Sequence, residues 1–342
     1  MKPRVAVNGF GRIGRMVFRK AVMDESLDVA AVNASYPPET LAHLLKFDST
    51  HGVFDADIET EEKALWVNGK RILIVNDRRP EKLPWGDLDI DIVVEATGKF
   101  KSKKEAGRHI TAGAEKVVIT APGKEEDVTI VMGVNESDYV PEHHHVISNS
   151  SCTTNCLAPV VKVLDRSFGI QSGLMTTVHS YTNDQMNIDN PHKDLRRARS
   201  CGQSIIPTST GAAKSIAKLL PRLEGKMNGM ALRVPTPNVS LVDLVVEVEK
   251  DITEEEVNHS FEEAARADMN GILSYSRDPL VSVDYNGNSH SSIIDGLSTM
   301  VVNERQVKVI AWYDNEWAYS CRVVDLVHYV GSFLKKTSMV SA

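Results

Sequence analysis

Short apolar runs alternate with amphipathic stretches over the first third of the chain. The runs at residues 4–8, 27–33, 90–95 and 117–120 are typical of buried strands, and residues 15–23 have a helical pattern. A further pair of strand-like segments, 64–67 and 71–75, flanks Asn68-Gly69, the strongest short signal for a hairpin turn. The alternation predicts an α/β fold with a mainly parallel sheet, which closes near Asn149.

The first strand runs directly into Gly9-Phe10-Gly11-Arg12-Ile13-Gly14, followed by a helix and a second strand. A G-x-G-x-x-G sequence in this βαβ setting indicates a dinucleotide site. Gly9 and Gly11 permit a tight turn that brings backbone N–H groups to a pyrophosphate, at the positive end of the helix. The alternative is a glycine-rich turn that binds nothing.

The end of the second strand bears on the choice of dinucleotide. An acidic residue that would hold the adenosine 2′-hydroxyl is expected there, and the chain has Asn33-Ala34-Ser35 instead. Without a carboxylate, a 2′-phosphate can be accommodated, with Ser35 or a nearby basic side chain such as Arg78 as donor. These residues favour NADP, with NAD also possible. The alternative is that Asn33 caps the turn that follows and that cofactor choice is decided elsewhere.

Residues 148–156, Ser-Asn-Ser-Ser-Cys-Thr-Thr-Asn-Cys, form a cluster of capping residues that leads into an apolar stretch at 157–168. This pattern predicts a helix start. A cysteine in the first turn, Cys152, would face unpaired N–H groups and the positive end of the helix dipole, which both favour thiolate. Cys152 is therefore the candidate nucleophile, whereas Cys156, Cys201 and Cys321 are interpreted as buried structural residues.

A cysteine nucleophile needs a base, and His179 lies at the polar end of a strand-like segment, 174–180. Basic residues gather at 192–199, Thr208-Ser209-Thr210-Gly211 opens a predicted helix, and Arg233 follows between apolar residues. Hydroxyls, a helix N-terminus and arginines are phosphate ligands, although a basic run is more often a solvated loop or a subunit contact. A dinucleotide, a thiol, a histidine and phosphate-binding elements together indicate an aldehyde-oxidising enzyme that forms a thioester.

Composition limits the partners, the location and the kinds of site that are expected. The 342 residues include 39 Lys and Arg against 46 Asp and Glu, for a net charge of −7, so nucleic acid is not expected as a primary partner. There is no apolar run of bilayer length and no signal-peptide core, which indicates a cytoplasmic protein without a membrane partner. Four cysteines are too few for a disulfide framework. The triplet His143-His144-His145 is interpreted as a solvated turn, and no metal site is expected.

Four motifs resemble phosphorylating glyceraldehyde-3-phosphate dehydrogenase, across essentially the whole chain and in order. They are Asn8-Gly9-Phe10-Gly11-Arg12-Ile13-Gly14-Arg15, Ser151-Cys152-Thr153-Thr154-Asn155-Cys156, His179 with Tyr181-Thr182-Asn183-Asp184-Gln185, and Trp312-Tyr313-Asp314-Asn315-Glu316-Trp317. The chain is most similar to the bacterial gluconeogenic branch that prefers NADP. The resemblance implies a Rossmann domain at 1–151, a catalytic domain with a mostly antiparallel sheet at 152–315, and a C-terminal helix at 316–334 that packs back on the first domain.

By this resemblance, Cys152 attacks glyceraldehyde 3-phosphate and His179 accepts the thiol proton. The thiohemiacetal gives hydride to the nicotinamide, and inorganic phosphate releases 1,3-bisphosphoglycerate from the thioester. The implied site residues fall into groups. The residues implied to bind the substrate phosphate are Thr182 and Arg233. Those implied to bind inorganic phosphate are Ser151, Thr153, Thr210 and Gly211, and Arg197 lies near both sites. Those implied to bind the cofactor are Gly9, Gly11, Arg12, Ile13, Thr97, Thr120 and Asn315.

Two departures from NAD-using members bear on the cofactor. Ala34 stands where those enzymes typically have Asp, and Asn190 where they have Leu, in a segment that reaches the cofactor of a neighbouring subunit. Both changes remove an obstacle to a 2′-phosphate. The resemblance also implies a homotetramer.

Two other functions stay open from the sequence. Erythrose-4-phosphate dehydrogenase is a relative with the same nucleophile, but it typically lacks the Thr182 and Thr210-Gly211 pattern. A non-catalytic binding or adhesion protein on the same fold would have no need of Cys152, His179 and Arg233 together.

Overall fold

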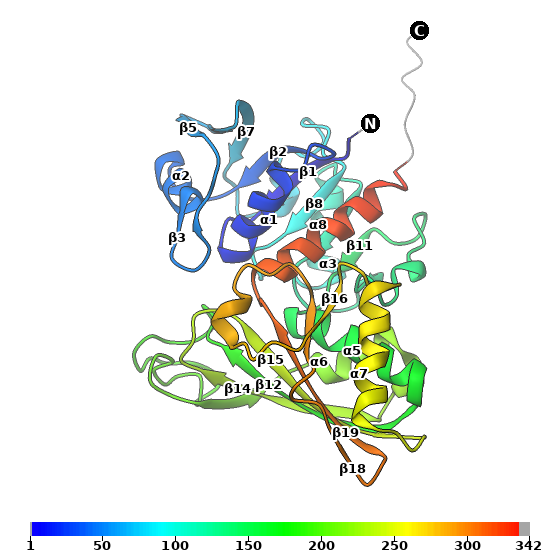
Figure 1. Ribbon diagram of the computed structural model, residues 1–342. Coiled ribbons are helices and arrows are strands. Elements are labelled where there is room, and N and C mark those ends of the chain that lie inside the picture. The colour runs from blue at the N-terminus through cyan, green and yellow to red at the C-terminus, as the bar shows by residue number, and fades with distance from the viewer. Residues whose placement is uncertain (1, 335–342) are drawn as a thin grey trace. The chain divides into compact units, whose positions relative to one another are not determined.

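The computed structural model describes residues 2–334, and their contacts divide the chain into two units. Among the described residues, the first unit comprises 2–130, Ser137–Ser150 and 320–334, and the second comprises Val131–Glu136 and Ser151–Tyr319. Figure 1 labels the main elements along the chain.

The first unit is built on a nine-stranded sheet in the order β10-β11-β9-β8-β1-β2-β7-β6-β5. The strands from β10 to β7 are parallel, whereas β6 and β5 are antiparallel additions at one edge. Its elements are β1 (Arg4–Asn8), α1 (Arg12–Val22), β2 (Asp28–Asn33), α2 (Pro38–Lys46), β3 (Phe47–Asp48), β4 (Gly52–Val53), β5 (Ile58–Glu61), β6 (Ala64–Val67), β7 (Lys70–Val75), β8 (Ile92–Glu95), α3 (Lys103–Ala106), α4 (Arg108–Thr111), β9 (Lys116–Ile119), β10 (Val128–Thr129) and β11 (Val146–Ser148). The predicted parallel α/β sheet is confirmed.

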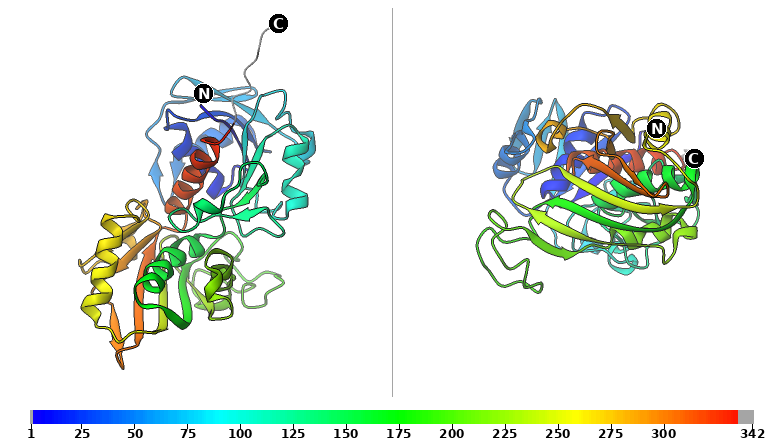
Figure 2. Two further views of the ribbon diagram at one scale, coloured as in Figure 1. Left: turned by 90° about the vertical axis from the view of Figure 1, so that its right-hand side faces the viewer. Right: turned by 60° about the horizontal axis from the view of Figure 1, so that its bottom comes forward.

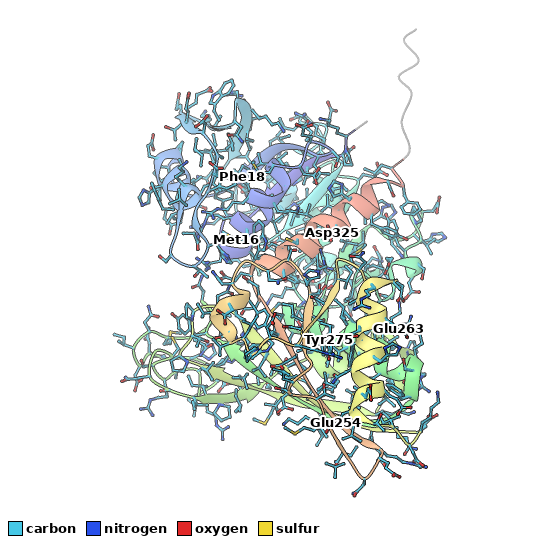
Figure 3. The ribbon with its side chains drawn as sticks, viewed as in Figure 1. Met16, Phe18, Glu254, Glu263, Tyr275 and Asp325 are labelled. Atoms are coloured by element: carbon cyan, nitrogen blue, oxygen red, sulfur yellow. The ribbon has the colours of Figure 1, made fainter. Side chains whose placement is uncertain are left out.

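Burial explains why the central strands lack an alternating pattern. Every residue of β8 and of β9 is buried, as expected for parallel strands covered on both faces. Helix α1 contributes the fully buried Met16 and Phe18 (Figure 3). Because parallel strands end at the same edge, Asn8, Asn33 and Glu95, the last residues of β1, β2 and β8, lie in register.

The predicted hairpin is present and has a larger role than expected. Asn68 and Gly69 have φ of 48° and 74°, the left-handed conformation that a tight hairpin turn between β6 and β7 requires. Strand β7 also pairs in parallel with β2, so the hairpin extends the main sheet. Strand β5, which the sequence pattern did not indicate, pairs with β6 and forms the outer edge.

The second unit has an eight-stranded sheet in the order β13-β14-β12-β15-β19-β17-β16, with β18 paired to β19. Its elements are α5 (Cys152–Phe168), β12 (Ile170–Ser180), β13 (Ile206–Ser209), α6 (Ala212–Leu219), β14 (Met227–Val234), β15 (Ser240–Val248), α7 (Glu254–Arg266), β16 (Leu273–Ser276), β17 (Ser292–Asp295), β18 (Met300–Val302), β19 (Gln306–Tyr313) and α8 (Trp317–Gly331), whose last part belongs to the first unit. Only β12–β14 and β16–β17 pair in parallel among these strands, so the mostly antiparallel sheet is confirmed.

One face of this sheet is covered by helices and the other is open. Helices α5, α6 and α7 lie on the same side of the long strands (Figure 2), and Phe261 of α7 is fully buried while Glu254 and Glu263 point outward. On the opposite face, Leu174 and Met230 are 67% and 41% exposed.

One short segment that precedes the expected domain boundary at 151 belongs to the second unit. Val131–Glu136 groups with the second unit because Val131 and Val134 join its apolar core. Lys162 of α5 also donates to the carbonyl oxygens of Gly133 and Val134, at 2.8 and 3.1 Å. Within residues 2–334, the structure has no helix that is both long and apolar enough to cross a bilayer.

Candidate active site

Cys152 is the first residue of α5, where the sequence placed it. The Ser151 hydroxyl caps this helix, accepting from the amide of Thr154 at 3.0 Å. Cys152 is a free, half-buried cysteine, and its Sγ lies 3.5 Å from Nε2 of His179 at the end of β12. The second unit therefore brings together the two residues that the sequence singled out for chemistry.

The contacts of His179 favour one position for its proton. Nδ1 lies 2.6 Å from the carbonyl oxygen of Ser180 and 2.8 Å from NH1 of Arg233. The shorter contact is to an oxygen that can only accept, which favours a proton on Nδ1. In the neutral ring Nε2 is then an acceptor, turned toward the thiol. Arg233 is paired in register with His179 on the neighbouring strand β14, and its NH1 donates to the same carbonyl at 3.0 Å.

The surroundings act on both ionisable groups. Burial raises the pKa of the Cys152 thiol, whereas the charge of Arg233 and hydrogen bonds from Thr153 oppose this shift. Burial and Arg233 both lower the pKa of His179, to about 3. Burial therefore opposes the thiolate that the helix start favours, and Nε2 of His179 is the neighbouring group that can take the proton.

Tyr313 links the two catalytic elements and was not identified as a site residue from the sequence. Its hydroxyl lies 2.9 Å from Oγ1 of Thr153 in α5 and 3.0 Å from Oγ1 of Thr177 in β12. The ring meets His179 edge to face, with centroids 6.0 Å apart. Tyr313 is 1% exposed, so these contacts form a buried brace between the helix that carries Cys152 and the strand that carries His179.

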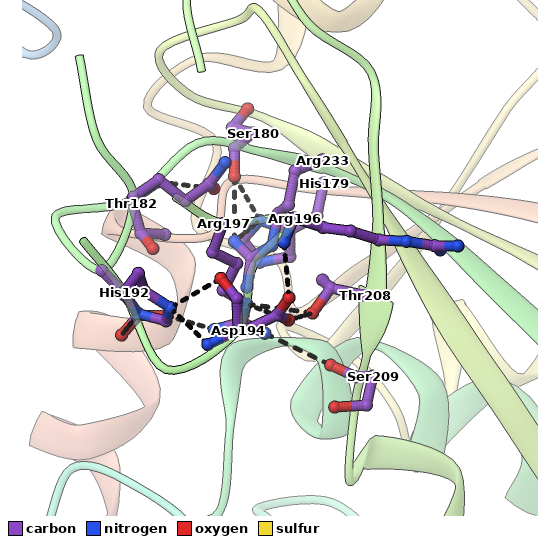
Figure 4. A network of polar contacts seen from close by, with 12 residues as sticks. His179, Ser180, Thr182, His192, Asp194, Arg196, Arg197, Thr208, Ser209 and Arg233 are labelled. Atoms are coloured by element: carbon purple, nitrogen blue, oxygen red, sulfur yellow. Dashed lines mark hydrogen bonds and ion pairs between the residues drawn. The ribbon is translucent and has the colours of Figure 1, made fainter. Parts of the chain in front are cut away.

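A network of polar contacts surrounds Arg197 near the start of α6, and Figure 4 shows it together with His179 and Arg233. Arg197 donates from Nε to the hydroxyl of Thr208 at 2.9 Å and from NH2 to the carbonyl of Ser209 at 3.3 Å, and it pairs with the Asp184 carboxylate. Thr208 in turn donates to Asp194 at 2.8 Å. Arg197 is thereby held beside the N-terminus of α6, an arrangement suited to an anion.

The remaining predicted phosphate residues lie in this unit with different environments. Thr210 Oγ1 accepts from the amide of Ala212 at 3.2 Å, and Gly211 caps α6 without a side chain. The amide of Thr182 donates to Gln185 at 3.3 Å. Thr153 is buried, with its hydroxyl directed at Tyr313.

A separate cavity of about 570 Å³ lies in the first unit, at the carboxyl ends of β1 and β2. Its lining includes six of the predicted cofactor residues: Gly9, Gly11, Ala34, Ser35, Arg78 and Thr97. Asn8, Asn33, Tyr36 and Lys99 also line it, although the sequence had not assigned them to the site. The glycine turn and the loop after β2 therefore line the same cavity.

The start of α1 suits a pyrophosphate. Gly11 is the N-cap and supplies no side-chain hydrogen bond, and the first turn contains no acidic residue. A Cβ at Gly11 would meet nothing within 4 Å, whereas one at Gly14 would lie 2.0 Å from the Gly9 carbonyl oxygen. The third glycine thus allows close packing, and the second leaves the helix N-terminus open to a ligand, so these residues fit a dinucleotide.

Comparison with known proteins identifies the family. The model of the glyceraldehyde 3-phosphate dehydrogenase C-terminal domain matches residues 151–315, and that of the glyceraldehyde 3-phosphate dehydrogenase NAD binding domain matches residues 3–103. The chain belongs to the glyceraldehyde-3-phosphate dehydrogenase family. It is 65% identical over 340 residues to glyceraldehyde-3-phosphate dehydrogenase 2 of Bacillus subtilis (strain 168), covering 99% of this chain and 100% of the relative.

Two further relatives show similar coverage. Glyceraldehyde-3-phosphate dehydrogenase of Geobacillus stearothermophilus is 59% identical over 332 residues, 97% of this chain and 99% of the relative. Glyceraldehyde-3-phosphate dehydrogenase 2 of Staphylococcus aureus (strain MRSA252) is 58% identical over 343 residues and covers all of both chains. The resemblance stated from the four motifs is confirmed.

Some residues that the resemblance assigned to the family's cofactor site do not line the cavity. The Arg12 guanidinium donates to the carboxylate of Asp48 at 2.9 and 3.1 Å, and Ile13 is not part of the lining. Thr120 lies outside it and donates to the Glu95 carbonyl at 3.1 Å. Asn190 and Asn315 belong to the second unit. A backbone amide can still serve where a side chain is turned away, so Arg12 and Ile13 remain candidates through the N–H groups of α1.

Proposed function

We propose that this protein catalyses the reversible oxidative phosphorylation of D-glyceraldehyde 3-phosphate to 1,3-bisphosphoglycerate, with Cys152 as the nucleophile and His179 as the base. The observation that carries the proposal is the 3.5 Å separation of Cys152 Sγ from an unprotonated His179 Nε2. The relatives that match over the full length are named for this dehydrogenase. The matching family models cover both the dinucleotide-binding and the C-terminal domain.

The first step joins the thiol to the aldehyde. The Cys152 proton moves to His179 Nε2 as the sulfur forms a bond to the carbonyl carbon, and the carbonyl oxygen takes up the negative charge. The Nε2–H that results is placed to donate to that oxygen. Because Arg233 and burial disfavour a charged His179, the imidazolium is short-lived and readily returns its proton.

Oxidation converts the thiohemiacetal on Cys152 into a thioester. NAD(P), when bound, supplies the acceptor for the hydride that leaves the substrate carbon. His179 takes the hydroxyl proton of the thiohemiacetal as the carbonyl forms again. An oxygen of inorganic phosphate then attacks the thioester carbon, the carbon–sulfur bond breaks, and the acyl phosphate departs while Cys152 regains a proton.

Phosphate binding is assigned to the residues around this pair. Thr182 and Arg233 are proposed for the substrate phosphate, and Ser151, Thr153, Thr210 and Gly211 for inorganic phosphate. Arg197 lies beside the start of α6 and serves both sites. The support is the positive end of two helices, α5 and α6, together with two arginines in one unit.

The dinucleotide is proposed to be NADP in preference to NAD. Ala34 places no carboxylate in the cavity, and Ser35 and Arg78 line it as donors for a 2′-phosphate. Gly9, Gly11, Thr97 and the amides that start α1 would hold the rest of the dinucleotide. Asn315, Asn190 and Thr120 are further candidates from the resemblance; Asn315 is buried and accepts from the Ser240 hydroxyl at 2.8 Å.

A homotetramer is also part of the proposal. The open face of the second sheet carries the exposed apolar side chains of Leu174 and Met230. A second copy would cover them. A cytoplasmic location fits a reaction that needs Cys152 as a reduced thiol.

The test is a spectrophotometric assay of the purified protein with glyceraldehyde 3-phosphate and inorganic phosphate. NADP is compared with NAD, and erythrose 4-phosphate with the triose. We expect phosphate-dependent reduction of the dinucleotide with the triose, and a higher kcat/KM with NADP. A higher kcat/KM with erythrose 4-phosphate would reject the substrate, and a higher value with NAD would reject the cofactor preference.

A further inference from the structure

A chain of buried polar side chains crosses the first unit at the carboxyl edge of its sheet. Asn33, Asn8 and Glu95 end the adjacent strands β2, β1 and β8 in register, so their side chains share one face. Behind Glu95 lie His109 of α4 and Trp85 of the preceding loop. Asn8, Glu95, His109 and Trp85 are each at most 1% exposed, whereas Asn33 opens onto the cavity.

The donor and acceptor of each hydrogen bond in this row of side chains follow when the assignment starts from Trp85, at the buried end of the row. The indole N–H of Trp85 is only a donor, and it lies 2.9 Å from Nδ1 of His109, so Nδ1 is the acceptor. The His109 proton therefore sits on Nε2, which lies 3.0 Å from Oε2 of Glu95 and donates to it. A neutral His109 leaves the negative charge on Glu95.

Four donors converge on the Glu95 carboxylate. His109 Nε2 and Asn8 Nδ2 reach Oε2, while the amide and the hydroxyl of Thr97 reach Oε1, the amide at 2.8 Å. A carboxylate is acceptor-only, so Asn8 must turn its NH2 toward Glu95 and its oxygen away from it. That oxygen accepts from Asn33 Nδ2 at 2.6 Å.

Asn33 is fixed in turn. Its second N–H donates to the carbonyl oxygen of Asp77 at 2.8 Å, and its Oδ1 accepts from the Asp77 amide at 3.2 Å. Both amide protons of Asn33 are thus used, and one lone pair on Oδ1 is left. Toward the cavity, Asn33 can act only as an acceptor.

We propose that Glu95 is a positioning residue for the cofactor: its buried charge orients Asn8, whose oxygen, together with the Asp77 backbone, holds Asn33 so that Asn33 Oδ1 accepts a hydrogen bond from an adenosine ribose hydroxyl. This inference rests on the proposed dinucleotide binding. It differs from the alternative in which Asn33 only caps the turn that follows. Asn33 would also supply an acceptor for a ribose hydroxyl in a protein that has Ala34 at the position where a carboxylate would accept that hydrogen bond.

The test compares the binding of NAD with that of its 2′-deoxy and 3′-deoxy adenosine analogues by calorimetry. In the wild type, loss of the hydroxyl that meets Asn33 should weaken binding about fivefold, the size of one hydrogen bond. Glu95→Gln puts an amide donor against Asn8 and His109 or against Thr97. Asn8 is then no longer held with its oxygen toward Asn33, which keeps only its contacts with Asp77. We expect weaker NAD binding in this variant and a deoxy penalty below about twofold.

Glu59→Gln is the control, because it neutralises an exposed carboxylate on the edge strand β5 and should keep the wild-type pattern. The inference is overturned if Glu95→Gln keeps the full deoxy penalty, or if neither analogue binds the wild type more weakly than NAD. Failure of the wild type to bind any dinucleotide would overturn the proposed function as well, and so is a distinct result.

A measurement on the wild type covers the case in which Glu95→Gln does not fold. Nitrogen-15 NMR of the histidine rings should show His109 neutral at pH 7, with its proton on Nε2. A proton on Nδ1, or on both nitrogens, would mean that the hydrogen bonds run in another direction and would overturn the inference.

Discussion

His179 and Arg233 are direct neighbours on the parallel strands β12 and β14, and both donate to the carbonyl oxygen of Ser180. The Ser180 carbonyl favours a proton on Nδ1 of His179, which leaves Nε2 to accept from Cys152. It also places a fixed positive charge beside a group that must become positive during the reaction. Arg233 therefore acts on the acid–base chemistry as well as on any phosphate.

Replacement of Arg233 tests this electrostatic role. The Arg233 charge lowers the pKa of both Cys152 and His179, so its removal raises both, and thiolate then forms only at higher pH. In Arg233→Leu, we expect the pH midpoint for alkylation of Cys152 by iodoacetamide to move upward relative to the wild type. Arg233→Lys keeps the charge and should move the midpoint less; an unchanged midpoint in the leucine variant would contradict the assignment.

Replacement of His179 by Asn tests its role as the base. Asn keeps polar character but has no site of comparable basicity, so the oxidation rate should fall by about 10²-fold or more. The measurement is single-turnover reduction of the dinucleotide across a range of pH. The variant should recover part of its rate at high pH, where hydroxide deprotonates Cys152. A near-normal rate constant at neutral pH would reject the base.

Replacement of Cys152 by Ser tests the nucleophile. A hydroxyl at this position is a much weaker nucleophile, and oxidation should fall by more than about 10³-fold. Dinucleotide binding should survive, because the cavity is lined entirely by the first unit. Cys156→Ser is the matched control: burial raises the pKa of that thiol far above its usual range, and activity should be retained. Substantial turnover by Cys152→Ser would rule out the thioester route.

The sequence predicted those features that depend on neighbours along the chain. The strand, glycine turn and helix at residues 4–23, the turn at Asn68-Gly69 and the capped start of α5 all follow from local chemistry. Other features arise from pairing between distant segments. The brace at Tyr313 and the contact between Glu95 and His109 join residues that no local pattern connects.

Glu95 was not predicted as a site residue, although its place in the sequence is unusual. Glu95 is a charged residue at the end of an otherwise apolar, fully buried strand. A charge in that setting requires buried hydrogen-bond donors nearby, which is a reason to suspect a site.

Introduction of a carboxylate at position 34 tests the cofactor preference. In Ala34→Asp, the new charge would repel a 2′-phosphate in the cavity, so the KM for NADP should rise about tenfold or more. The KM for NAD should change little or fall, because a carboxylate there can accept from ribose hydroxyls. Ala34→Asn is the uncharged control of the same size. If Ala34→Asp changed the KM for NADP and the KM for NAD equally, Ala34 would not be a determinant of the cofactor preference.

Removal of the Tyr313 hydroxyl tests the buried brace. Tyr313→Phe would leave the hydroxyls of Thr153 and Thr177 without their shared partner, a loss of about 1–3 kcal/mol in unfolding free energy. In a domain of this length the thermal midpoint should fall by about 2–4 °C for each kcal/mol of unfolding free energy that is lost. We also expect a lower kcat, because the brace holds the start of α5 against β12.

Tyr139→Phe provides the matched control for this prediction. Tyr139 is also buried, but its hydroxyl has no hydrogen-bond partner among the residues that the structure describes. Its removal relieves an unsatisfied group and should leave the thermal midpoint unchanged or slightly raised. Equal losses in the two variants would show that burial of the ring, and not the bridging hydroxyl, supplies the stability at Tyr313.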